Sequence, residues 1–343
     1  MQLDKVGQKT AYKIAKNIYE TFPIRDNQDL IERIESCSQE LSLKKYTNDD
    51  YDFAFHKADV IINESDKEGI KFITIFDLDY PQNLENLRKD VPIILNYKGD
   101  IKKFTNRYAC AVIGTREPTE HGYKLGLKVG EIFGEHNFIV VSGLAKGCDT
   151  AGHLGCLNKK GTTAAVLAHG LHKIYPKENR GLADRILEEG GLLISEYFLH
   201  EPARQNYFVQ RDRIQAGLSD FIFIVETGIK GGTMHTVNFA FESHIKIFAY
   251  NHPAKYLGED KVQGNQFLIN ERRATPVGNP DDIDSLLKKF KSVSHNITWK
   301  STQDNSIPKD GFIINNDGTF NFNRNETKPS DKKANNDQFT LWE

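Results

Sequence analysis

Glycine loops that carry basic side chains are the segments of this sequence best suited to chemistry, and that chemistry is phosphate binding. In the first loop, Gly114 permits a sharp turn before Arg116, whose planar guanidinium matches two phosphate oxygens. A plain alternative is that Arg116 pairs with a surface carboxylate. In the second loop, Gly143 and Gly147 precede an expected helix, whose free backbone N–H groups and dipole form an anion site.

A third glycine loop and an arginine pair add to this set. Lys230 and Gly232 lie in a segment where an expected strand passes through a loop into an expected helix, which predicts another nest of N–H groups. Arg211 and Arg213 are separated by one residue and follow two aromatic residues in the run 206–214. Phosphate contacts beside stacking surfaces are what single-stranded nucleic acid requires, although the same run also fits the solvated start of a helix.

No catalytic set accompanies these loops. Asp149 and His153 are four residues apart on an expected helix and resemble metal ligands, but no third ligand is nearby, which favours a capping carboxylate and a packed histidine. Ser142 and Ser195 lack the GxSxG pattern of a nucleophile elbow, and HExxH is absent. We therefore expect no enzyme activity, no metal and no cofactor.

The elements that position these loops alternate between short apolar runs and helical stretches. The expected buried strands are 71–76, 93–97, 108–113, 138–142, 163–167, 192–195, 221–226 and 247–250, and the expected helices include 123–135, 151–159, 180–189 and 233–242. Apolar strands separated by amphipathic helices indicate a parallel sheet covered on both faces. The predicted fold class is α/β, a Rossmann-like doubly wound and mostly parallel sheet, with its ligand at the carboxyl ends of the strands.

A small helical domain, residues 1–65, is expected before this core, which spans 66–290. The glycine turn at 6–11 resembles half of a helix-hairpin-helix, but a plain helical packing domain is the favoured explanation, because short glycine turns are common.

The remaining residues, 291–343, are expected to form a mostly disordered tail. In 301–343 only 10 of 43 residues are apolar and 8 are Asn, too few apolar residues to support a core. A short hairpin within 312–322 is one expected exception. The tip carries Gln338, Leu341 and Trp342, whose apolar members are out of character with the tail and suit docking to a partner.

Composition narrows the class of protein. The chain has 343 residues, with 45 basic and 47 acidic ones giving a net charge of −2, so no overall basic field indicates nucleic acid. No run approaches the ~18 apolar residues of a membrane span, and the N-terminus lacks a secretory signal. Four cysteines without a CxxC pair indicate a reduced protein. We expect a soluble, cytoplasmic protein with no membrane partner.

Together, the motifs resemble the DNA-processing protein A (DprA/Smf) family. The resemblance covers about residues 1–290 and rests on segments that follow the family's order: 79–81, 91–92, 111–116, 142–153, 175–176, 190–197, 211–214, 232–236 and 263–265. It implies a recombination mediator that binds single-stranded DNA in a basic pocket, forms a homodimer and loads RecA recombinase. By motif match, the DNA pocket is lined by Arg116, Lys177, Arg211 and Arg213, with backbone turns at Gly143, Gly147 and Gly232.

Three departures from the family pattern matter. Asp212 stands where the family has Asn between its two arginines, which is expected to weaken phosphate affinity. Gly231 replaces a hydroxyl residue in the loop of Gly232. After Lys289 there is no winged-helix pattern of the kind that many members carry.

Two rival interpretations stay open. The loop 231–233 also resembles the Lonely-Guy phosphoribohydrolases, but Thr236 stands where their catalytic glutamate belongs. A nucleotide-sensing relative on the same fold presents the same loops to a small phosphorylated ligand.

The tail tip resembles the short peptide by which bacterial proteins dock on the replication sliding clamp, with Leu341 and Trp342 filling the apolar cavity.

Overall fold

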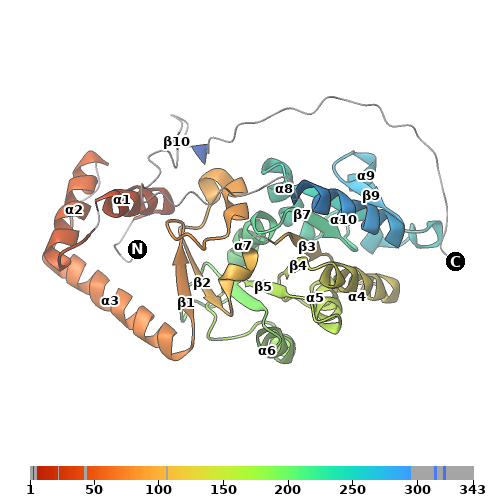
Figure 1. Ribbon diagram of the computed structural model, residues 1–343, viewed down its shortest axis with the longest axis horizontal. Helices are drawn as coiled ribbons and strands as arrows, with labels where there is room; N and C mark the ends of the chain where they lie inside the picture. The colour runs from red at the N-terminus through yellow and green to blue at the C-terminus, as the bar shows by residue number, and fades with distance from the viewer. Residues whose placement is uncertain are drawn as a thin grey trace.

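The structure, a computed structural model, describes residues 3, 6–21, 23–41, 45–105, 107–294, 313–314 and 320–321. Its centre is a nine-stranded sheet (Figure 1). The strands are β1 (Lys71–Thr74), β2 (Ile94–Lys98), β3 (Ala109–Ile113), β4 (Ile139–Ser142), β5 (Thr163–Leu167), β6 (Leu192–Ser195), β7 (Phe221–Ile224), β8 (Lys246–Tyr250) and β9 (Thr275–Val277). Their spatial order is β1-β2-β6-β5-β4-β3-β7-β8-β9. From β6 to β9 all neighbours pair parallel, whereas β2 pairs antiparallel with both β6 and β1.

Helices cover both faces of this sheet. One face packs against α4 (Glu120–Glu135), α5 (Cys148–Asn158), α6 (Arg180–Glu188) and α10 (Pro280–Ser294), and the other against α7 (Gln205–Gly217), α8 (Thr233–Glu242) and α9 (Gln263–Asn270). Short 3₁₀ helices complete the core: η1 (Gln82–Asp90), η2 (Ile101–Phe104), η3 (Lys177–Asn179), η4 (Ala254–Tyr256) and η5 (Asp260–Val262). The α/β, doubly wound and mostly parallel architecture is as the sequence predicts.

The alternation of side chains along β3 shows why both faces need cover. Cys110 and Val112 join the cluster that contains Phe133 of α4, while Ala111 joins the cluster that contains Val237 of α8. Successive residues of a strand point to opposite faces, so a strand that is apolar throughout must be buried on both sides. All five residues of β3 are buried.

The chain reverses its direction across the sheet between β3 and β7. From β3 it builds outward through β4, β5 and β6, and from β7 it builds the other way through β8 and β9. The loops that leave β3 and β7 therefore pass onto opposite faces of the sheet, and in this fold class ligands bind at such a switch point. A backbone hydrogen bond of 2.7 Å from Thr115 N to Glu226 O joins the two loops.

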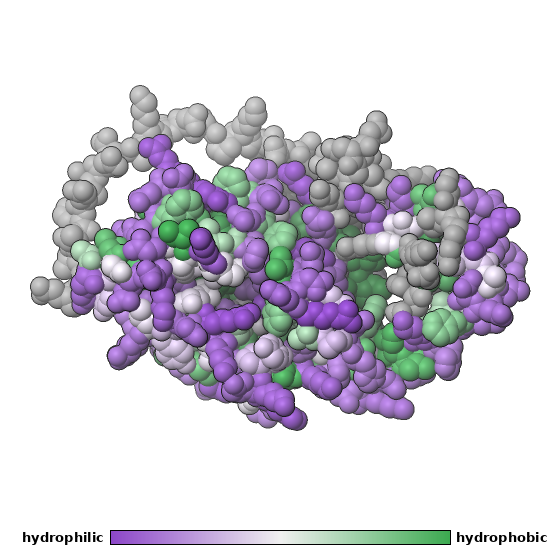
Figure 2. All heavy atoms as spheres, turned by 180° about the vertical axis from the view of Figure 1, so that it is seen from behind, coloured by the Kyte–Doolittle hydropathy of each residue, from purple (hydrophilic) through white to green (hydrophobic). Residues whose placement is uncertain are grey.

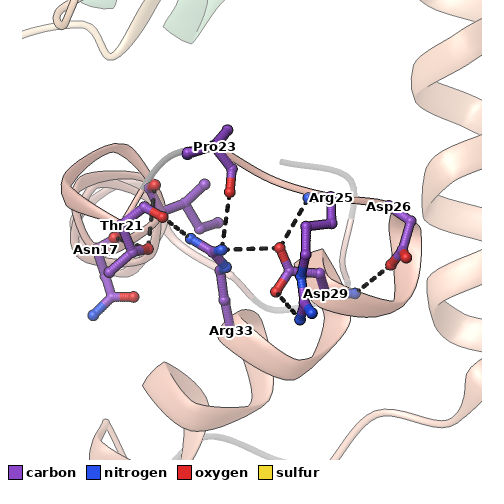
Figure 3. A network of polar contacts seen from close by, with 8 residues as sticks. Asn17, Thr21, Pro23, Arg25, Asp26, Asp29 and Arg33 are labelled. Carbon is purple, nitrogen blue, oxygen red and sulfur yellow. Dashed lines mark hydrogen bonds and ion pairs between the residues drawn. The ribbon is translucent and has the colours of Figure 1, made fainter.

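Three helices precede the sheet: α1 (Gln8–Glu20), α2 (Asn27–Glu40) and α3 (Asn48–Lys67), as the sequence predicts. They lie to one side of it in Figure 1 and have a small core of their own. The turn between α1 and α2 is held by Arg33, which donates to Pro23 O at 3.1 Å, to Thr21 O and to the Asp29 carboxylate at 2.9 Å (Figure 3). Hydrogen bonds from the Arg25 backbone N–H and from both arginines hold the pKa of Asp29 well below its usual range.

The helical segment contacts the core through stacked rings and ion pairs at the surface. Tyr12 and Tyr19 of α1 stack on Phe76, with centroids 5.9 and 5.0 Å apart. At the end of α3, Glu64 accepts a hydrogen bond of 2.6 Å from His200 of the β6–α7 loop. Stacked rings and a surface ion pair are modest contacts, so most of the stability of each part comes from its own core.

Four described elements of the core were not predicted. The run 206–214 forms most of α7, and α9, β9 and α10 follow the last predicted strand. β9 has only three residues and contains Pro276, and prolines are confined to edge strands, which is where β9 lies. Within the tail, β10 (Ile313–Ile314) pairs antiparallel with β11 (Phe320–Asn321), while Gln338, Leu341 and Trp342 lie outside the described residues.

The surface is mostly hydrophilic. Figure 2 shows this on the rear face, where apolar residues gather only in small separate patches. In the part of the chain that the structure describes, no helix has the length and apolar character needed to cross a membrane.

Candidate functional site

The predicted phosphate-binding loops all leave the same edge of the sheet. In spatial order, the strand ends along this carboxyl edge are those of β6, β5, β4, β3 and β7. Neighbouring strands lie about 4.8 Å apart, so these five ends span about 19 Å. Helix α7 begins at this edge, because it follows β6 and leads to the opposite end of β7.

An aromatic ring on α7 lies at the centre of this edge. Phe208 has the Arg116 guanidinium 5.5 Å from its ring centroid and the Tyr175 ring 5.8 Å away, tilted by 57°. Arg116 comes from the loop after β3 and Tyr175 from the loop after β5, so three elements meet at Phe208. Arg116 is exposed and Tyr175 is 52% exposed. We call Arg116, Tyr175 and Phe208 the Phe208 platform: two accessible rings beside a cation.

Arg211 lies beneath this platform and is not the surface group that the sequence predicts. Its side chain is buried, with its Cζ 6.0 Å from the Phe208 ring centroid. Nη1 donates to Gly143 O at 2.7 Å and to Val166 O at 2.6 Å, and Nε donates to the neighbouring Asp212 at 3.1 Å. Arg211 therefore holds the ends of β4 and β5 in place, and any DNA contact that it makes stays a prediction.

Asp212 lies among positive groups. Besides the bond from Arg211, its carboxylate is near His235 and Arg116, which lower its pKa, but burial outweighs them and raises the pKa above the usual value. When ionised, the carboxylate offsets part of the positive charge of the site, and its effect on phosphate affinity stays a prediction.

Arg213 points away from the platform into an internal ion pair. Nη2 donates to both oxygens of Glu196, at 2.7 and 2.6 Å, and the side chain is only 4% exposed. Buried charges are stable in proteins when paired in this way. The structure thus places the Arg213 side chain in an ion pair with Glu196, and its DNA-binding role stays a prediction.

The loop after β4 is ordered by Asp149. Its carboxylate accepts hydrogen bonds from Gly143 N at 3.0 Å and Ala145 N at 3.2 Å, so it ties down the loop rather than capping α5, whose N-cap is Gly147 without a side-chain hydrogen bond. Burial raises the pKa of Asp149 to about 6. His153 is buried, 2.6 Å from Thr163 Oγ1, and burial lowers its pKa to about 3. Asp149 and His153 thus have contacts within the loop and the core, and the helix-capping role that the sequence suggested for Asp149 is not what the structure shows.

Two of the predicted glycines are required by their surroundings. Gly147 has φ of +77°, and a Cβ there would lie 2.5 Å from Thr115 O in the loop after β3. A Cβ on Gly143 would lie 2.4 Å from Arg211 Nη1. Gly232 differs: it has helical backbone angles, and a Cβ there would meet no atom within 4 Å, so its surroundings do not demand glycine.

The two predicted lysines are exposed at this edge. Lys177 lies in η3 of the β5–α6 loop, two residues after Tyr175, and Lys230 lies in the β7–α8 loop. Neither forms an ion pair with another described residue. Lys146 of the β4–α5 loop, by contrast, pairs with Glu178 at 2.6 Å.

Glu226, which the sequence left without a role, binds the β3–α4 loop. It is fully buried, and its two oxygens accept hydrogen bonds from Thr119 N at 2.7 Å and Thr119 Oγ1 at 2.6 Å. Thr119 is the N-cap of α4, so Glu226 fixes the start of that helix beside Arg116. Its position at the end of an expected strand was the only signal for this role.

The sequence thus placed the candidate loops on one edge of the sheet but did not give the contacts of each side chain. The structure brings together Arg116, Arg211 and the glycines of the β4–α5 loop, and it adds the partly exposed ring of Phe208 and the exposed ring of Tyr175. The two aromatic residues before Arg211 were the signal for the first of these rings.

Comparison with known proteins identifies the relatives of this arrangement. A family model described as DNA recombination-mediator protein A matches residues 71–288. DNA processing protein DprA of Bacillus subtilis is 32% identical over 217 residues, which are 63% of this chain and 71% of that protein. DprA of Streptococcus pneumoniae is 38% identical over 187 residues, 53% of this chain and 64% of the relative. The chain spans about half the length of the Smf proteins of Synechocystis and Escherichia coli that it matches.

Two solved structures resemble the whole architecture. The X-ray structure of DprA from Streptococcus pneumoniae superposes with a TM-score of 0.66 at 26% identity, over 82% of this chain and 94% of the other. A structure of DNA processing protein A from Helicobacter pylori, described by its single-stranded DNA binding mode, gives a TM-score of 0.57 at 25% identity, over 64% and 97%. Because the family model covers more than half of the sequence, the chain belongs to the DNA recombination-mediator protein A family.

Proposed function

We propose that this protein binds single-stranded DNA along the carboxyl edge of its sheet and acts as a recombination mediator that loads RecA on the bound strand. The observation that carries the DNA-binding part is the Phe208 platform, where two accessible rings lie beside an exposed guanidinium. Bases of a single strand stack on such rings while cations contact the backbone. A duplex keeps its bases stacked inside, so it is the weaker ligand.

The charges of the edge predict the salt dependence. Arg116, Lys177 and Lys230 are exposed. Each phosphate contact on a single strand contributes about −0.7 to the slope of log affinity against log salt, so three contacts give a slope of about −2. Fluorescence anisotropy with a labelled single strand, its duplex and a panel of mononucleotides tests this. Equal affinity for duplex, a flat salt response, or tighter binding of a mononucleotide than of the strand would contradict the proposal.

Two variants have matched controls in the same chain. Phe208→Leu removes the ring but keeps apolar volume, and Phe241→Leu is its control, because Phe241 carries Arg273 at 4.7 Å near the opposite edge of the sheet. Arg116→Ala removes the platform's cation, and Arg272→Ala, at an exposed site before β9, is its control. Loss of one base stack costs about 1–3 kcal/mol, so Phe208→Leu should weaken binding at least fivefold. Equal losses in variant and control would place the DNA elsewhere.

RecA loading is the finer part of the proposal. A mediator must leave the strand accessible to the recombinase, which suits an open edge better than a closed channel. The test is the rate at which RecA begins single-strand-dependent ATP hydrolysis on DNA covered by single-strand binding protein. We expect the rate to rise with this chain and not with its Arg116→Ala variant.

Two partners from the sequence analysis remain proposals. A homodimer is expected, and sedimentation velocity of the full chain measures it. The sliding-clamp contact through Gln338, Leu341 and Trp342 concerns residues outside the described part, and calorimetry with the full chain and its Leu341→Ala/Trp342→Ala variant tests it.

We also propose that the site performs no catalysis. Glu226, the carboxylate at the start of the loop that contains Gly232, is buried and bonded to Thr119, which supports a structural role. Release of a free base from a nucleoside monophosphate, lost on Glu226→Gln, would contradict this.

A further inference from the structure

A second aromatic stack lies beside the Phe208 platform. The rings of Tyr197 and Tyr207 are 3.9 Å apart and nearly parallel, at 13°, and the guanidinium of Arg204 lies 5.3 Å from the Tyr207 centroid. Tyr197 belongs to the β6–α7 loop, Arg204 is the N-cap of α7, and Tyr207 lies in its first turn. We call these three residues the Tyr207 stack.

The position of the Tyr207 stack is fixed by the chain itself. Tyr207 precedes Phe208 on α7, so the two rings leave the helix about 100° apart around its axis, with a rise of about 1.5 Å. Tyr175 of the Phe208 platform comes from the loop after β5, and Tyr197 comes from the loop after β6, the next strand along the edge. The stack therefore extends the platform by one strand towards the β6 side.

The outer member of the stack is accessible. The Arg204 side chain is 58% exposed, and Tyr207 is partly exposed. A guanidinium over a ring offers a planar face for a base and N–H donors for a phosphate at the same place. This is the combination found at the Phe208 platform.

A carboxylate next to the stack restrains Arg204. Glu201 lies 4.0 Å from Arg204 Nη2 and accepts a hydrogen bond of 3.3 Å from the Tyr207 hydroxyl, and its side chain is 41% exposed. An exposed pair at this separation is weak, so a phosphate can replace Glu201 as the partner of Arg204. As long as Glu201 is ionised, its negative charge also repels a phosphate that approaches Arg204.

We propose that the Tyr207 stack is a second nucleotide subsite, which takes the nucleotide next to the one held on Phe208 and sets the course of the strand along the edge towards β6. This inference rests on the proposed function, since it concerns the same DNA. It adds a length dependence: only oligonucleotides that extend past the Phe208 platform reach Arg204 and Tyr207.

The test is anisotropy of the full chain with labelled oligothymidylates of increasing length. Arg204→Gln should leave the affinity for the shortest bound oligomer unchanged, weaken binding of longer ones about fivefold, and reduce their salt slope by about 0.7. Tyr207→Leu should show the same length dependence, with its thermal unfolding checked against the wild type. Glu201→Gln should act in the opposite direction and tighten binding of the longer oligomers, because it removes a negative charge next to the subsite.

The control lies on the other side of the platform. Lys255, in the loop after β8, has its Nζ 5.2 Å from the Tyr256 ring, so Lys255→Gln removes a similar cation–ring contact. We expect it to behave as the wild type at all lengths. If Lys255→Gln shows the length-dependent loss and Arg204→Gln does not, the strand runs towards β8 and the inference is wrong. The inference is also wrong if Arg204→Gln weakens the affinity equally at all oligomer lengths, or does not weaken it at any length. If the wild type binds no oligothymidylate of any length, the proposed DNA binding fails together with the second subsite. If the wild type binds but the Arg204→Gln result is not the expected one, only the second subsite fails.

Discussion

Replacing Arg211 by alanine should destabilise the fold, whereas the same change at Arg116 should not. Arg211 donates two hydrogen bonds to backbone carbonyls and one to Asp212, all in the interior. Its removal leaves those acceptors, including a carboxylate, without their donor. Removing one partner of a buried ion pair costs about 3–5 kcal/mol.

This cost can be expressed as a melting temperature. In a domain of the size matched by the family model, residues 71–288, 1 kcal/mol corresponds to roughly 2–4 °C, so Arg211→Ala should lower Tm by roughly 6–20 °C. Arg116 is exposed and contributes only a cation–ring contact, worth about 0.5–1 kcal/mol, so Arg116→Ala should lower Tm by roughly 4 °C at most. Thermal unfolding followed by circular dichroism measures both.

A double variant separates the lost ion pair from the lost packing. Arg211→Gln leaves Asp212 charged, and Arg211→Gln/Asp212→Asn removes that charge, so the double variant should recover part of the lost Tm. Both Arg211 variants should weaken single-stranded DNA binding, because the loop anchored at Gly143 O loses its support. If Arg211→Ala melts within about 2 °C of the wild type, the guanidinium is not buried as described and the reasoning fails.

Four further outcomes test other parts of the structure. Gly147→Ala should lower Tm by several degrees, since φ is +77° and the new Cβ would lie 2.5 Å from a backbone oxygen of the neighbouring loop; an unchanged Tm would show that the two loops separate easily. Asp212→Asn should tighten DNA binding at pH 8. The affinity of the wild type should rise as the pH falls towards the raised pKa of the Asp212 carboxyl, and this rise should be smaller in Asp212→Asn. Identical pH profiles of the two proteins, measured by anisotropy, would show that Asp212 does not affect DNA binding. The pKa of Asp149 is raised to about 6, so its contribution to stability is present below the unfolded pKa near 4 and is lost as the pH rises through 6. The Tm of Asp149→Asn should therefore fall less than the Tm of the wild type between pH 4 and pH 7. An equal fall in both proteins would contradict this. The pKa of Asp29 is lowered, so its contribution is present above its unfolded pKa and is lost as the pH falls through the folded value; Arg33→Gln should lower Tm at pH 7 and reduce acid sensitivity, which differential scanning calorimetry measures.

Local patterns in the sequence were sufficient for most of the architecture. The strands β5 and β6 and the helix α8 have the predicted bounds, because each is a continuous apolar or amphipathic run between turn residues. The site region was also predictable, since the glycine loops follow strands, and parallel strands bring their carboxyl ends to one edge. α7 was the main ambiguity, because a helix start and a nucleic-acid-binding run have the same composition.

Tertiary structure decided the order of the strands and the role of each arginine. No local pattern states that β3 lies beside β7, yet this neighbour relation sends the two loops to opposite faces and lets Glu226 bind the start of α4. Arg116 and Arg211 have the same side chain and each precedes an acidic residue, but one is exposed on the Phe208 ring and the other is buried beneath it. Whether a guanidinium faces water or two backbone carbonyls depends on which strands end around it. The sequence by itself thus determined the fold class and the edge at which the candidate loops gather, and the packing of distant segments determined which charges at that edge remain exposed.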